Sequence, residues 1–256
     1  MEIENPCPMN RERLEAYLAS HAGNDGGNPS SGLWICGIEF GGEFDPPEVG
    51  SQPELEPNHW TEEHLKRYPD SVKAQYHQKA AKFLVALEQI RQNPSRSAIL
   101  DDWRDYVANR LYTRGGASFK LNLFPFSSPT VKASGWWEAY GTIFGFKNKG
   151  EYFEACRELR FKFLRQNRDK YNPRIILGTG KTYLRDFASA FGFENAESQS
   201  VQLSGGGSTR ECYLLRQNAS TMVVCPFFGG RYGINSDELI LELAKLVYSE
   251  EKRLLG

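Results

Sequence analysis

Short apolar runs and longer amphipathic stretches alternate along this chain, and their order predicts its secondary structure. The short runs are rich in β-preferring residues, which is typical of buried strands; we expect strands over 33–38, 119–125, 174–178 and 221–226. The longer stretches repeat apolar positions at helical spacing; we expect helices over 8–21, 60–90 with an interruption near Pro69, 101–112, 151–171 and 181–191. A closing helix follows, with Asn235 and Glu238 as its capping box.

Strands that alternate with helices favour a parallel sheet covered on both faces. The predicted fold class is therefore α/β, a three-layer α/β/α sandwich around a mostly parallel central sheet. The segments 201–203 and 212–216 are expected to add a small antiparallel pair, joined by the glycine-rich loop 205–207. We see no internal repeat and no domain boundary, and we expect one domain over 1–256, with 1–31 as an N-terminal helix and loop extension.

The first predicted strand ends abruptly in a segment of glycines, acids and prolines. In open α/β sheets, ligands bind just beyond the carboxyl ends of the strands. Glu39 therefore lies where a catalytic carboxylate would be presented, and Gly37, Gly41 and Gly42 allow the backbone to approach a ligand closely. The alternative interpretation is a tight turn with surface acids, because glycine-rich strand ends are common.

Composition narrows the class of protein. The 256 residues are 40% hydrophobic and 13% aromatic, which suits a substantial core, and no apolar run is long enough to span a membrane. The acidic start of the chain lacks the blocks of a signal peptide, and five cysteines without close pairing indicate reduced thiols. We therefore expect a cytoplasmic protein, without a membrane partner, that is a monomer.

Charge and metal-ligand spacing say little about partners. The net charge is −1, so a DNA-binding protein of this composition would need its lysines and arginines gathered on one face. The cysteines and the four histidines show no metal-type spacing, and His59 and His64 make a weak pair at best. We therefore expect no metal and no other cofactor.

One short motif resembles a phosphate-binding P-loop. Gly178-Thr179-Gly180-Lys181-Thr182 lies between a predicted strand and a predicted helix, but Ile175 occupies the position of the first glycine of that pattern. The cradle of backbone N–H groups would be incomplete, so a plain strand-to-helix turn is the better interpretation. A nucleotide hydrolase of another α/β family stays open as an alternative.

The strand ends taken together resemble the uracil-DNA glycosylase superfamily over about residues 32–247. Gly37-Ile38-Glu39-Phe40 fits the spacing of the family motif whose acid or amide positions the attacking water, and 120–125 is similar to the strand whose asparagine reads the extruded base. The segments 174–184 and 227–232 are similar to the family's third strand with its helix and to a run before its last helix. The chain departs from the family at Val224-Cys225-Pro226-Phe227, which lacks the usual His-Pro-Ser histidine, and none of the four histidines lies near.

This resemblance implies a DNA glycosylase that flips out a modified or damaged base and hydrolyses its N-glycosidic bond. Glu39 would stabilise the cationic sugar and orient water, and the amide of Asn122 would match the base edge. Phe40, Phe124 or Trp136 would sandwich the base. The candidates for DNA contacts are Ser127, Ser128, Lys132, Lys181, Arg231 and Tyr232.

Each assignment has an ordinary structural alternative. Asn122 could cap a turn, Trp136 could belong to the core, and Arg231 could pair with Asp237 or Glu238. A non-catalytic nucleic-acid-binding relative is the main functional alternative, because the family's histidine is missing. Glycines 41, 42, 229 and 230 remove side-chain volume at the rims of the expected site, which favours a bulky base such as a hypermodified pyrimidine of phage DNA.

Overall fold

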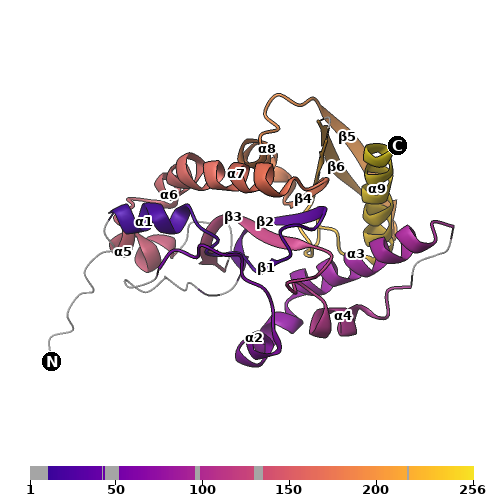
Figure 1. Ribbon diagram of the computed structural model, residues 1–256, viewed down its shortest axis with the longest axis horizontal. Coiled ribbons are helices and arrows are strands. Elements are labelled where there is room, and N and C mark those ends of the chain that lie inside the picture. The colour runs from indigo at the N-terminus through magenta and orange to yellow at the C-terminus, as the bar shows by residue number, and fades with distance from the viewer. Residues whose placement is uncertain (1–10, 42, 44–51, 96–98, 130–134, 218) are drawn as a thin grey trace.

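The computed structural model describes residues 11–41, 43, 52–95, 99–129, 135–217 and 219–256 (Figure 1). Its centre is a seven-stranded sheet in the order β1-β3-β2-β4-β7-β6-β5. The strands are β1 Gly26–Gly27, β2 Leu33–Gly41, β3 Phe119–Ser128, β4 Ile175–Thr179, β5 Ser198–Gly205, β6 Ser208–Arg216 and β7 Thr221–Cys225. The central strands β3, β2, β4 and β7 are parallel to one another. At one edge β1 pairs antiparallel with β3, and at the other β6 pairs antiparallel with β7 and β5 with β6. The prediction of an α/β fold with a mostly parallel central sheet is confirmed.

Helices cover both faces of this sheet because alternate strand residues are apolar on each side. Leu33 and Ile35 of β2 pack in one core cluster, whereas Trp34 and Cys36 pack in the other. Figure 1 shows the helices in two groups about the sheet. The first cluster is covered by α3 (Gln75–Gln92), α4 (Trp103–Asn109) and α9 (Asp237–Leu255), and the second by α1 (Arg11–Leu18), α5 (Thr142–Phe144), α6 (Lys149–Ala155), α7 (Phe161–Tyr171) and α8 (Leu184–Phe191).

The predicted helices differ from the observed ones at their breaks and caps. The stretch over 60–90 divides into α2 (Glu62–Arg67), a 3₁₀ turn (Pro69–Lys73) and α3, because Pro69 cannot continue the helix. The stretch over 151–171 contains a π turn (Cys156–Arg160) between α6 and α7. The closing helix is capped by Ser236, whose Oγ accepts a hydrogen bond from the Leu239 N–H, so the predicted Asn235 cap is wrong.

The pairing of β2 with β3 decides what lies at the carboxyl edge of the sheet. Gly37 stands opposite Asn122 and Glu39 opposite Phe124, after which the register shifts so that Phe40 pairs with Ser127. Pro125 lies within the skipped segment, and it has no N–H to give to the ladder. The shift turns the end of β2 outward, so that Phe40 is partly exposed while the preceding residues are buried.

The described residues bear on three further features of the chain: its cysteines, membrane-spanning helices and metal-ligating clusters. Four cysteines there are buried and free, namely Cys36, Cys156, Cys212 and Cys225. In the same part of the chain, no helix is both long enough and apolar enough to cross a bilayer, and no cluster of three or more metal-ligating side chains occurs.

Candidate active site

A cavity of about 600 Å³ opens beside the carboxyl end of β2 and the first half of β3. Its floor is the sheet, and its walls are the start of α3, the turn before it and the segment after β7. The residues that line it include Asp25, Gly37, Glu39, Phe40, Arg67, Tyr68, Gln75, Tyr76, His77, Lys120, Asn122 and Phe227. The structure thus brings Glu39, Asn122 and Phe40 together, as the sequence predicts for residues at adjacent strand ends.

Asn122 can occupy the cavity floor because residue 37 is glycine. A Cβ atom at position 37 would lie 2.5 Å from Asn122 Oδ1 and 3.1 Å from Lys120 Nζ. The first distance is shorter than real Cβ contacts and the second is tighter than most of them, so Gly37 makes the space that these two polar groups fill. This is the close approach for which a glycine is required at the strand end.

The amide of Asn122 is held in one orientation by its neighbours. Its Oδ1 accepts a hydrogen bond from Lys120 Nζ at 2.7 Å, and its Nδ2 donates to the Gly23 carbonyl at 2.8 Å. The backbone carbonyl of Asn122 accepts from the fully buried guanidinium of Arg160 at 3.1 Å. One lone pair and one N–H of the amide stay available, so Asn122 presents a donor and an acceptor in a fixed geometry.

A buried charged group that sequence reasoning missed lies beside Asn122. Lys120 Nζ is 3.2 Å from Asp25 Oδ2, and both side chains are almost completely buried. His77 Nε2 lies 3.7 Å from Asp25 Oδ1, and burial lowers the pKa of His77 to about 4. The imidazole is therefore neutral at pH 7, and within the described chain its Nδ1 has no hydrogen-bond partner.

His77 also changes one sequence expectation. The sequence predicts that no histidine lies near the site, because none is close to Pro226 along the chain. The structure places His77, from the first turns of α3, in the wall of the cavity that holds Glu39. In the sequence, the signal for this buried polar cluster was Lys120, a cation between apolar strand residues. A buried cation requires an acid nearby, and Asp25 is that acid.

Glu39 forms a buried ion pair with Lys149 of α6, a helix that covers the opposite face of the sheet from α3. Its Oε1 lies 2.8 Å from Nζ of Lys149 in α6, and each side chain is 4% exposed. Burial raises the pKa of Glu39, although the hydrogen bond and the charge of Lys149 act in the opposite direction. The second oxygen, Oε2, is buried and accepts no hydrogen bond from the described residues.

Two of the three aromatic residues expected around a base lie elsewhere. Phe124 is fully buried and stacks on Phe153 with 4.0 Å between ring centroids, so it belongs to the core. Trp136 is also buried and stacks on Tyr152. Neither lines the cavity, because both project into the apolar layer beneath α6, whereas Phe40 stands at the cavity mouth.

The predicted DNA-contact residues divide into three groups. Ser127 and Ser128 take part in internal hydrogen bonds, with Tyr140 and Lys149 respectively, and Lys181 pairs with Glu211 at 3.3 Å. Lys132 lies outside the described residues.

Arg231 and Tyr232 remain exposed on the loop after β7. Arg231 makes no ion pair with any described residue, and Asp237, one of its expected partners, binds Lys82 instead at 2.7 Å. The pairing alternative for Arg231 is therefore not observed.

The segment that resembles a P-loop is already occupied by structural hydrogen bonds. The Gly180 N–H donates to the Cys225 carbonyl, and the Thr179 hydroxyl contacts Tyr76 OH and the Cys36 carbonyl. These groups tie β4 to its neighbours and to α3. They are not available as a phosphate cradle, which agrees with the interpretation of this segment as a turn.

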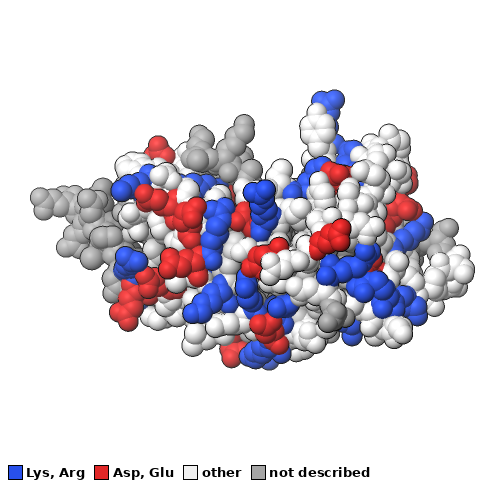
Figure 2. Space-filling view, turned by 90° about the horizontal axis from the view of Figure 1, so that it is seen from above, with Lys and Arg blue, Asp and Glu red and all other residues white. Residues whose placement is uncertain are grey.

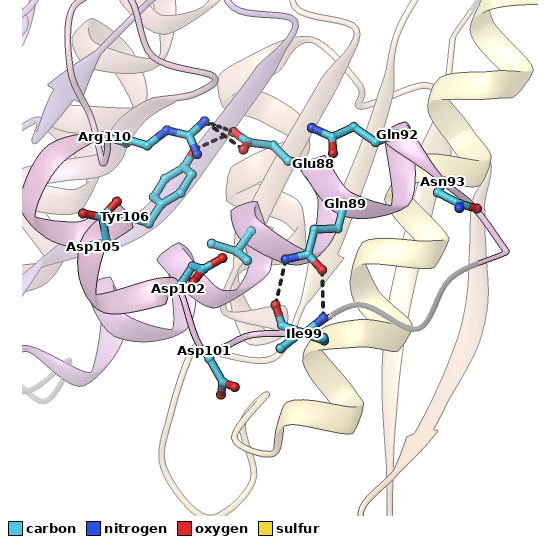
Figure 3. A pocket seen from close by; sticks show the side chains of 11 residues that line it. Glu88, Gln89, Gln92, Asn93, Ile99, Asp101, Asp102, Asp105, Tyr106 and Arg110 are labelled. Atoms are coloured by element: carbon cyan, nitrogen blue, oxygen red, sulfur yellow. Dashed lines mark hydrogen bonds and ion pairs between the residues drawn. The ribbon is translucent and has the colours of Figure 1, made fainter.

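A second cavity, of about 690 Å³, lies at the other end of α3 against α4 (Figure 3). Its main polar groups are paired with each other: Arg110 with Glu88, and Gln89 with the backbone of Ile99. No candidate site residue from the sequence lines it.

The charged side chains on the face shown in Figure 2 are mixed in sign. Lysines and arginines alternate there with acids and do not form a patch of one sign.

Neither a protein-family model nor a curated protein sequence matches this chain. The function therefore has to be inferred from the cavity and its residues.

Proposed function

We propose that this protein is a DNA glycosylase with a uracil-DNA glycosylase-like fold, which flips out a modified or damaged base and hydrolyses its N-glycosidic bond. The observation that carries the proposal is a cavity beside the carboxyl end of β2 that combines Glu39, the fixed amide of Asn122 and the aromatic ring of Phe40. A carboxylate, an amide and a ring are the groups that sugar-cation stabilisation, base reading and base stacking require.

The chemistry assigns a separate task to each group. Breaking the bond from C1′ to the base nitrogen sends the bonding electrons to the base and leaves positive charge on the sugar. The Glu39 carboxylate stabilises that charge and orients water, whose oxygen adds to C1′ and whose proton passes to Glu39. Lys149 favours the ionised form of Glu39 in a buried setting, and His77 is a neutral hydrogen-bonding group for the departing base.

The cavity also supports a base that carries a substituent. Its volume of about 600 Å³ falls within the range typical of small-molecule sites, which is roughly 300–1,000 Å³. A Cβ atom at Gly41 or Gly230 would meet none of the described residues within 4 Å, so these two glycines leave space among them. We therefore propose a modified pyrimidine, such as those of phage DNA, as the substrate.

Excision of a base from DNA is the direct test. Oligonucleotides that contain uracil or 5-substituted cytosines are incubated with the protein, and the free base and alkali-labile sites are measured. Glu39→Gln should lower excision by a factor of about 10² or more, because an electrostatic stabiliser is lost. Glu43→Gln, which changes an exposed acid four residues away, is the matched control and should keep full activity.

Asn122 should affect which base is removed more than how tightly DNA is held. Asn122→Ala should weaken discrimination between bases by about 1–3 kcal/mol, because a buried base edge loses its partner. Equal losses on all bases would contradict this role. DNA that is bound but left intact would favour the non-catalytic alternative, and nucleotide turnover without DNA would favour a nucleotide hydrolase.

A further inference from the structure

Exposed aromatic side chains gather around the mouth of the cavity. Phe40, Tyr68 and Phe227 all line it, and their exposed fractions are 37%, 49% and 46%. A fourth, Tyr232, is 75% exposed and follows Phe227 by five residues. Large aromatic surfaces left in water cost free energy, and their concentration at one site indicates a binding surface.

The loop after β7 begins at the cavity wall with Phe227, and Arg210 of β6 holds its far part, donating hydrogen bonds to the Arg231 and Gly233 carbonyls at 3.0 Å. The Ile234 N–H donates to the Phe227 carbonyl at 2.9 Å, which closes the loop at its base. Gly229 packs against the side chain of Gln75 in the cavity wall, where a Cβ atom would lie 2.5 Å from Gln75 Oε1. The loop therefore extends from the cavity wall toward β6, and the exposed Arg231 and Tyr232 continue the surface that begins at Phe227.

Two of these tyrosines are accompanied by arginines. The guanidinium carbon of Arg67 lies 5.4 Å from the ring centroid of Tyr68, and that of Arg231 lies 5.5 Å from the ring centroid of Tyr232. Among the described residues, neither arginine takes part in an ion pair. Each pair thus offers a flat ring for a base and a positive charge for the adjacent phosphate.

The chain as a whole has no excess of positive charge to attract a duplex, because its net charge is −1. Duplex DNA buries its base faces in the stack and offers mainly phosphates to a surface, whereas an unpaired strand offers base faces as well. Exposed rings with a few arginines therefore match an unpaired strand better than a duplex.

We propose that the rim formed by Arg67, Tyr68, Phe227, Arg231 and Tyr232 binds single-stranded DNA, with bases next to the target stacked on the tyrosines. The proposal rests on the proposed function only for its choice of DNA, and it specifies which form of DNA that function uses. An unpaired target also needs no energy to break a base pair before it enters the cavity.

Binding is measured separately from excision, by fluorescence anisotropy with a labelled oligothymidine strand and the same strand annealed to its complement. The single strand should bind more tightly than the duplex. Tyr68→Ala and Tyr232→Ala should each weaken single-strand binding by about 5-fold to 100-fold, since one base loses its stacking partner. Tyr68→Phe and Tyr232→Phe should bind like the wild type, because stacking needs the ring and not the hydroxyl.

The arginines have their own readout in the salt dependence. Arg67→Gln and Arg231→Gln should each reduce the slope of log affinity against log salt by about 0.7, as expected for one phosphate contact on a single strand. For the two tyrosine-to-alanine variants, Tyr248→Ala is the matched control, because the ring of Tyr248 contacts Lys252 on α9 and lies outside the cavity lining.

The outcomes separate this inference from the proposed function. Tighter binding of the duplex, or alanine variants that bind single strands like the wild type, would overturn the single-strand assignment even if a base is excised. Single-strand binding that depends on Tyr68 and Tyr232, without excision of any base, would uphold the rim and refute the glycosylase.

Discussion

Replacement of His77 by glutamine should make the stability of this protein less sensitive to acid. Burial lowers the pKa of His77 to about 4 in the folded chain, against 6.5 for an ordinary histidine. Between these two values the unfolded chain binds a proton that the folded chain does not, so the free energy of unfolding falls as the pH decreases from about 6.5 to about 4. In His77→Gln this contribution is absent.

The magnitude follows from the same two pKa values. One pKa unit corresponds to about 1.4 kcal/mol, so the lowering from 6.5 to about 4 amounts to about 3 kcal/mol. The assay is urea unfolding followed by tryptophan fluorescence at a series of pH values in this window. The difference between the wild-type and variant curves isolates His77, because the other titrating groups contribute to both.

The nearest acid opposes this effect and makes the test decisive. Asp25 lies 3.7 Å from His77 and favours the charged imidazole, whereas burial favours the neutral form and is the larger influence. If the free energy of unfolding of the wild type minus that of His77→Gln instead rises toward low pH, the attraction to Asp25 outweighs burial; if this difference stays constant, the pKa of His77 is not shifted. Either result would refute the lowered pKa of His77. His21, whose pKa is also lowered to about 4, should account for acid sensitivity that His77→Gln retains.

Two further substitutions test the floor of the cavity. Lys149→Met should move the acidic limb of the excision profile to higher pH, because it removes the group that lowers the pKa of the buried Glu39 carboxylate; Lys149→Arg should restore the limb in part. Gly37→Ala should destabilise the fold by about 1–3 kcal/mol in urea unfolding, because its Cβ would overlap Asn122 Oδ1. Gly41→Ala, which meets no neighbour within 4 Å, is its control, and equal losses in both variants would contradict the packing role of Gly37.

The strands were predictable because their pattern is simple. Buried parallel strands are continuous apolar runs, and β2, β3, β4 and β7 each begin within one residue of the predicted start. Glu39 and Asn122 share a cavity because β2 and β3 pair in parallel with Gly37 opposite Asn122, which places the carboxyl end of β2 beside the first half of β3. The end of β3 was less predictable, because the strand resumes after Pro125 through a register shift that no local pattern indicates.

The rest of the site could not be derived from the sequence, because it depends on distant contacts. Asp25, His77 and Lys149 lie on three separate segments, and only the packing of α3 and α6 on the sheet brings them to the strand ends. The predictions for Phe124 and Trp136 failed for a related reason. The sequence around an aromatic residue near a strand end is the same whether its ring packs in the core, as both do here, or contacts a ligand.

The two buried ion pairs at this edge favour a functional site over a purely structural one. Removing two charges from water costs several kcal/mol per ion, and apolar residues of similar size would often stabilise a core equally well or better. Yet Asp25, Lys120 and Glu39 all line the same cavity, and Lys149 holds Glu39 there from α6. A ligand on which charge develops during a reaction gives both pairs a use, because fixed charges in a dry site stabilise such a transition state without reorganising. The carboxylate of Glu39, with one oxygen bound by Lys149 and the other unpartnered among the described residues, is the group best placed for that task.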